Sequence, residues 1–165
     1  MSATSTRARP QAVAQLPLLD RLIDEAPQSA LAPAEALGLL RRSVRRDVEA
    51  LLNARRRWRS WPRSLRRLAV SPLNFGIPDC TGGNFHDSDQ RETLRREIED
   101  TIRRFEPRFR SVHVTIVESE NPLEATLRLR IEALLRVEPA PEPISFDTVV
   151  DSVTASVLVR AADYV

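Results

Sequence analysis

Glu106, Pro107 and Arg108 place a carboxylate, a proline and a guanidinium side by side in the stretch RRFEPRFR. A carboxyl group is the general acid of a glycosidase, which also needs a second carboxyl group roughly 5 to 10 Å away across a sugar-binding cleft. Aromatic residues, which often line such clefts, make up only 5% of this chain. Arg108 also favours the ionised form of a neighbouring carboxyl group, which is the wrong form for a general acid. The triplet therefore does not predict an enzyme.

Other residues with chemical potential are few. The chain has one cysteine, Cys80, and two histidines, His86 and His113, and they follow no spacing typical of metal ligands or of a catalytic triad. The glycine pair in TGGN lacks the spacing and the lysine of a phosphate-binding loop, and the chain contains no lysine at all. We therefore expect no metal, no cofactor and no small-molecule substrate.

Basic charge is concentrated in one segment. Residues 41–70 hold eleven arginines against two acidic residues, a local charge of +9, whereas the whole chain has a net charge of +2. Within it, the Arg-rich segment 55–67 interleaves arginines with Trp58 and Trp61, a pattern that can neutralise phosphates and stack on bases. The alternative is a solvated arginine face, or one that docks on an acidic protein surface while the tryptophans pack. Charge alone leaves a nucleic-acid-binding module open as the alternative function, and we rank it second.

The N-terminal half of the chain predicts helices. Residues 1–15 lack periodicity and are typical of a flexible tail, and residues 16–30 predict a short helix that docks through the apolar cluster of Leu18, Leu19 and Leu22. Helical spacing of apolar residues then predicts one helix from about 33 to 57 and a second from Ser88 or Asp89. A long loop separates the two. Pro107 disfavours a helical conformation for Glu106, so the second helix should end there.

The C-terminal half predicts strands. Apolar residues alternate with polar ones in SVHVTIVE and in ATLRLRIEALL, and a segment rich in β-branched residues, ISFDTVVDSVTASVLV, predicts one long or bulged strand or two short ones. The expected fold is α+β, with two main helices on one face of a small, mainly antiparallel sheet of about three strands. We divide the single domain, residues 16–165, into a helical part at 33–106 and a sheet at 110–160. Such a sheet leaves two exposed edges, which are templates for pairing with another chain unless they are blocked.

The order of several motifs resembles the TssE family. SVRRDVEALLNARR, SPLNFGIPD, a helix running into FEPRF, then SVHV and PISFDTVVD occur in that order, and LLDRL precedes them. The resemblance covers about residues 16–155. TssE is the small baseplate subunit of bacterial type VI secretion systems, related to a wedge protein of contractile phage tails and often labelled "lysozyme-like" despite a structural role.

The resemblance implies an assembly role without lysozyme activity. Glu106, Pro107 and Arg108 match the family's signature, which is associated with sheath assembly, and Asn74, Phe75 and Gly76 match its loop motif, with phenylalanine where tyrosine is common. The implied partners are the wedge subunits TssF and TssG, and the sheath subunits TssB and TssC, which we expect to bind by adding a strand to the sheet. The chain has no apolar run of the roughly 20 residues that span a bilayer and no secretory leader, so we expect a cytoplasmic protein without membrane insertion.

Overall fold

The computed structural model describes residues 20, 22, 33–56, 62, 64–80, 85, 87–118, 126–138 and 140–162. The predicted flexible tail at 1–15 lies outside these residues. So do Leu18, Leu19, Trp58, Trp61, His86 and the TGGN motif. The predictions made for them are therefore not addressed by the structure.

Two long helices form where the apolar spacing predicts them, but the first ends at Asn53, before the predicted end near residue 57. Helix α2 spans Pro33–Asn53 and helix α3 spans Ser88–Phe105. Each buries one apolar stripe in the core; the buried members are Ala36, Leu40, Val44, Val48, Leu51 and Leu52 of α2, and Leu94, Ile98 and Ile102 of α3. The side chain of Asp87 caps α3 by accepting a hydrogen bond from the backbone N–H of Asp89 at 2.9 Å. The helix thus begins at Ser88, one of the two predicted starts, and its cap is the residue before it.

Four strands form one antiparallel sheet in the order β1-β2-β3-β4. They are β1 Phe109–Val117, β2 Thr126–Leu135, β3 Glu142–Asp151 and β4 Val157–Ala161. The α+β class is confirmed, with four strands in place of about three, because the last predicted strand segment folds back on itself. The Asp151 carboxylate makes this turn by accepting hydrogen bonds from the backbone N–H groups of Val153 and Thr154, and Ala155 adopts a φ of 52°.

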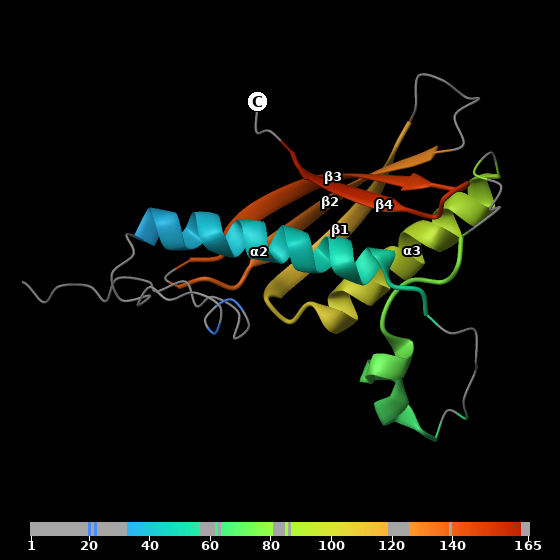
Figure 1. Ribbon diagram of the computed structural model, residues 1–165, viewed down its shortest axis with the longest axis horizontal. Coiled ribbons are helices and arrows are strands. Elements are labelled where there is room, and N and C mark those ends of the chain that lie inside the picture. Colours follow the sequence, from blue (N-terminus) through green and yellow to red (C-terminus); the bar gives the residue numbers. More distant parts are fainter. Residues whose placement is uncertain are drawn as a thin grey trace, which may run out of the picture.

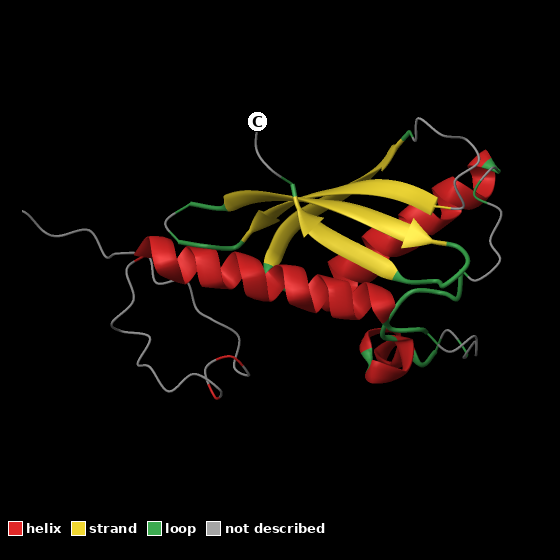
Figure 2. Cartoon of the chain, turned by 45° about the horizontal axis from the view of Figure 1, so that its top comes forward, coloured by secondary structure: helices red, strands yellow, loops and turns green. Residues whose placement is uncertain are grey.

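Both helices cover the same face of the sheet. Helix α3 packs along β1 and helix α2 packs along β4, while the opposite face of the sheet is left uncovered by these helices (Figures 1 and 2). Alternate strand residues point into the core between the layers, including Val114, Leu129, Ile131, Phe146 and Val159. Among the residues described here, no helix is long and apolar enough to cross a membrane.

Two short 3₁₀ helices, η2 Arg66–Val70 and η3 Pro72–Asn74, lie between α2 and α3. The chain returns to the body of the domain through an isolated parallel bridge between Arg55 and Ile77, in which the backbone N–H of Arg56 donates to the carbonyl of Ile77 at 2.9 Å. Ile77 is fully buried, so this return point is anchored in the core.

Candidate functional site

The Glu106-Pro107-Arg108 triplet forms the corner between α3 and β1. Glu106 ends the helix, and its backbone N–H still donates to the carbonyl of Ile102 at 2.9 Å. Pro107 is exposed at the turn. The chain enters β1 immediately afterwards, with a register shift at Arg110 that leaves this residue without a direct partner in β2.

Glu106 and Arg108 bind each other. The Glu106 carboxylate is only 5% exposed, and it accepts hydrogen bonds from Nε, Nη2 and the backbone N–H of Arg108, with Nε at 2.6 Å. A guanidinium can hold both carboxylate oxygens in this way, and a lysine ammonium cannot reproduce the geometry. The pair closes the corner on itself, and the Glu106 carboxylate is thereby engaged and turned away from solvent.

A ladder of charges continues from this pair across α2. Arg108 Nη2 also donates to Asp47 at 2.8 Å, Asp47 accepts from Arg46 at 3.1 Å, and Arg46 lies 2.9 Å from Asp20. Burial alone would lower the pKa of the Arg108 guanidinium, but its bonds to Glu106 and Asp47 outweigh that effect and raise it. The ladder thus ties the corner to α2 and to residue 20.

Asp20 belongs to the LLDRL motif and lies against α2. It accepts a hydrogen bond from Ser43 Oγ at 2.6 Å, and this bond, together with Arg46, lowers the pKa of the Asp20 carboxyl group. Leu22, two residues further on, is exposed. The aspartate therefore holds this point of the motif while the neighbouring leucine side chain faces solvent.

The loop motif lies next to the corner. Asn74 is buried and its Nδ2 donates to the carbonyl of Ala69 at 2.8 Å, while the Phe75 ring meets the Phe105 ring edge to face, with centroids 5.4 Å apart. Gly76 has a φ of +99°, and a Cβ at this position would lie 2.2 Å from the carbonyl oxygen of Ala54. Both the conformation and the close approach require glycine. Since Phe105 directly precedes Glu106, the two predicted motifs meet in space.

The β4 edge of the sheet is closed by side chains of α2. Asn53 acts as a peptide group, with its Nδ2 donating to the Val157 carbonyl at 2.7 Å and its Oδ1 accepting from the Val157 N–H at 2.9 Å. One turn earlier, Arg45 donates to the Val159 carbonyl at 3.0 Å and Glu49 accepts from the Val159 N–H at 3.4 Å. These outward main-chain groups are therefore already paired.

Side chains of α3 occupy part of the β1 edge in the same manner. Arg95 donates to the Val114 carbonyl at 3.0 Å and Glu99 accepts from the Val114 N–H at 3.1 Å, while Arg103 reaches the Val112 carbonyl at 3.5 Å. Burial would raise the pKa of Glu99, but hydrogen bonds from Val114, Arg103 and Arg95 lower it below its usual value. At these positions the two edges are blocked by side chains, which is the condition that the sequence left open.

A sequence signal for the edge contacts exists. The residues whose side chains bond to the sheet edges recur every fourth position, at 45, 49 and 53 in α2 and at 95, 99 and 103 in α3. Each of them directly follows a residue of the buried apolar stripe. Residues four apart lie on one helix face, so each row follows the margin of the buried face.

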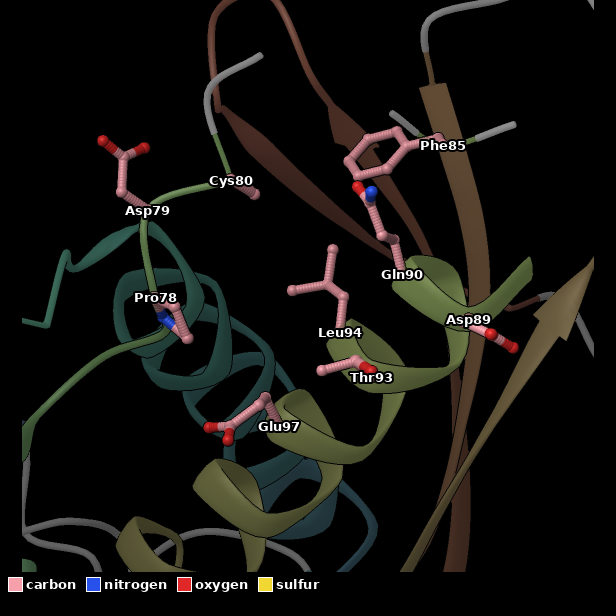
Figure 3. Close-up of a pocket in the computed structure, with 9 residues that line it drawn as sticks. All are labelled: Pro78, Asp79, Cys80, Phe85, Asp89, Gln90, Thr93, Leu94 and Glu97. Carbon is pink, nitrogen blue, oxygen red and sulfur yellow. The ribbon is translucent and has the colours of Figure 1, made fainter. Parts of the chain in front are cut away.

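A cavity of about 350 Å³ lies between α3 and the segment before it (Figure 3). Its wall is largely apolar and includes Pro78, Cys80, Phe85 and Leu94. The carboxylates of Asp79 and Asp89 point away from Leu94, and burial raises the pKa of the Cys80 thiol, which disfavours the nucleophilic thiolate (Figure 3). The residues that line the cavity thus include no paired carboxylates facing one another and no activated thiol.

The arrangement is an α+β domain with two helices on one face of an antiparallel sheet, and the predicted motifs make internal contacts. The chain belongs to the family of baseplate wedge protein gp25, whose model matches residues 39–140, more than half of the chain. This is the family of TssE, so the resemblance inferred from the motifs is confirmed. The match spans both motifs and ends just before β3.

Comparison with curated proteins gave no significant match, and neither did comparison with solved structures. Family membership places the chain among the structural proteins of contractile injection baseplates, which fits a non-enzymatic role and binding to other baseplate subunits.

Proposed function

We propose that this protein is a structural subunit of the type VI secretion baseplate, which joins the wedge complex in the cytoplasm and helps to nucleate the contractile sheath. The observation that carries the proposal is the intact triplet at the junction of α3 and β1, within the region that matches the wedge family. The Glu106–Arg108 pair fixes the direction in which β1 leaves the helix. Its role is to present the sheet at a defined angle.

TssF and TssG are the proposed wedge partners. Leu18, Leu19 and Leu22 would insert into them, and Leu22 is exposed beside Asp20, which is tied to Ser43 and Arg46. The charge ladder from Asp20 to Glu106 gives a physical connection between this docking segment and the corner.

Sheath subunits TssB and TssC are the proposed partners in strand addition, and β1 is the edge that the corner orients. An added strand must displace the side chains of α3 that occupy this edge. Arg103 makes the longest of these contacts and its side chain is 56% exposed, whereas the Arg95 side chain is 17% exposed. Pairing would therefore start at Val112, where the cap is weakest, and proceed toward Val114.

The test is sheath assembly in living cells. The chromosomal gene is replaced by variants carrying Glu106→Ala, Arg108→Ala or both, and assembly is counted with a fluorescent sheath subunit. Arg110→Ala serves as the matched control, since Arg110 is exposed on the neighbouring strand. We expect loss of sheaths in the triplet variants and normal numbers in the control. Sheath assembly that survives deletion of the gene would refute the proposal.

A nucleic-acid-binding module is the second candidate function. The observation that favours it is the exposure of Arg55, Arg66 and Arg67, although Arg56 is held by Glu97 at 2.8 Å. Titration of the purified protein against a DNA duplex over a range of salt concentrations decides the matter, because phosphate neutralisation predicts a steep loss of affinity with salt. Absence of salt-dependent binding would remove this candidate.

A further inference from the structure

Residues 64–75, which we call the lobe, carry an unusual share of exposed apolar side chains. Leu65, Val70, Leu73 and Phe75 are 40% to 63% exposed, and none of the residues of η2 is buried. The other large exposed apolar side chains among the described residues are spread over five separate places: Leu22, Val117, Leu134, Val153 and Leu158. Figure 1 shows the lobe, in green, projecting away from the layer of helices and the sheet.

The lobe is ordered although it buries little apolar surface. The backbone N–H groups of Leu68, Ser71 and Asn74 each donate to the carbonyl three residues earlier, at 3.0 to 3.2 Å. The Ser71 hydroxyl donates to the Leu68 carbonyl at 2.8 Å, and Asn74 Nδ2 closes the turn on Ala69. An apolar surface held in a fixed shape by polar contacts loses little conformational entropy when it binds.

One end of the lobe is held next to the corner formed by Glu106, Pro107 and Arg108. The ring contact between Phe75 and Phe105 and the close approach of Gly76 to Ala54 hold it against the end of α2 and the end of α3. A partner that covers the lobe would therefore lie beside the Glu106–Arg108 corner.

The charge of the lobe restricts the partner. Arg66 and Arg67 are exposed, and residues 64–75 contain no acidic side chain. Exposed apolar side chains close in sequence to arginines are typical of a protein interface, in which aliphatic side chains fill a pocket and arginines pair with carboxylates at its rim. Single-stranded nucleic acid is bound by stacking on aromatic rings, but the apolar side chains of the lobe are mostly aliphatic, and the ring of Phe75 is engaged with Phe105.

We propose that the lobe is a docking surface for a protein partner that offers an apolar pocket rimmed by carboxylates. The inference rests on the proposed function, because it takes a neighbouring baseplate subunit as that partner. Leu73 and Val70 fill the pocket, and Arg66 and Arg67 pair with its rim.

Binding of the full-length protein to a purified complex of TssF and TssG tests this proposal. Val70→Ser with Leu73→Ser removes the apolar contact, and Arg66→Glu with Arg67→Glu reverses the charge. Leu158→Ser, at an exposed leucine on β4, is the matched control. We expect each lobe pair to weaken binding at least about tenfold, the control to have no effect, and the charge-reversed pair to lose the salt dependence of the unmodified protein.

Binding to three other probes tests the alternative partners of the lobe: a second copy of the chain, a DNA duplex and vesicles of phosphatidylglycerol. Binding to any of these that the lobe variants abolish, with unchanged binding to the wedge complex, would overturn the proposal. So would unchanged binding of folded lobe variants to the wedge complex, while the unmodified protein still supports sheath assembly. Failure of the unmodified protein to support sheaths in cells would instead count against the proposed function itself.

Discussion

Removing Arg108 should cost more stability than removing Glu106, although the two side chains form one pair. Glu106 is 5% exposed, and among the described residues Arg108→Ala leaves its carboxylate with only the backbone N–H of residue 108 as a hydrogen-bond donor. Loss of one partner of a buried ion pair costs about 3 kcal/mol. Glu106→Ala leaves Arg108 with Asp47 and a side chain that is 23% exposed, so the cost should be about 1 to 2 kcal/mol.

The double variant should be less damaging than the sum of the two single variants. Once both groups are gone, no buried charge is left without a partner, and we expect a coupling free energy of about 2 kcal/mol between the two positions. The magnitude follows from the short, two-oxygen contact between the side chains and from the burial of the carboxylate.

Urea unfolding at neutral pH measures these free energies, provided that circular dichroism and fluorescence give the same transition. Arg110→Ala is the control and should change the free energy of unfolding by less than about 0.5 kcal/mol, since Arg110 is exposed. Additive effects of the two substitutions, or a larger cost for Glu106→Ala than for Arg108→Ala, would refute the argument that the pair stabilises the corner.

Three further predictions concern backbone strain, an edge cap and acid stability. Gly76→Ala should destabilise the protein by about 3 kcal/mol or more because of its φ of +99° and the clash with backbone. Gly38→Ala, inside α2, should instead stabilise it by about 0.5 to 1 kcal/mol, because an added Cβ would lie 3.8 Å from Arg42 Nη1, an ordinary contact. Thermal unfolding of both variants tests this, and equal effects would contradict it. Asn53→Ala should lower the free energy of unfolding by about 1 to 2 kcal/mol and speed hydrogen exchange of the Val157 amide, which loses its acceptor. Unchanged exchange at that amide would show that the Asn53 contact does not protect the edge. The pKa of Glu99 is lower in the folded protein than in the unfolded chain, so the unfolded chain binds more protons on acidification. The contribution of Glu99 to the free energy of unfolding is therefore present above about pH 4.3 and is lost as the pH falls through the folded pKa. In urea titrations between about pH 2 and 5, Glu99→Gln should make the free energy of unfolding fall less steeply with pH. An unchanged dependence on pH would show that Glu99 is not the group responsible.

Periodicity predicted the helices and strands because each buries a single face. Six apolar residues of α2 and the alternating residues of β1 and β2 all follow this rule. The boundary between β3 and β4 could not be read, since the turn sequence SVTAS contains no glycine, proline or asparagine. The turn depends instead on the Asp151 carboxylate and on Ala155 in a conformation that alanine seldom adopts.

The site was predicted only in its residue types. Sequence order indicated that Glu106 and Arg108 matter together, but it could not show that Asp47, distant in the chain, completes their contacts. Nor could it show that Phe75 meets Phe105, because that contact depends on how the loop returns to the core at Ile77. Contacts of this kind arise from tertiary packing, on which local patterns carry no information.

The side chains that occupy the two sheet edges have a consequence for the subunit before it meets its partners. A stray strand, from another copy or from an unfolded chain, finds the main-chain groups of Val114 and Val157 already bonded to Glu99, Arg95 and Asn53. It gains new bonds only by breaking existing ones and leaving charged groups behind, so random pairing has little net driving force. At these positions the sheet therefore favours a strand that brings its own compensating contacts over one that meets it by chance.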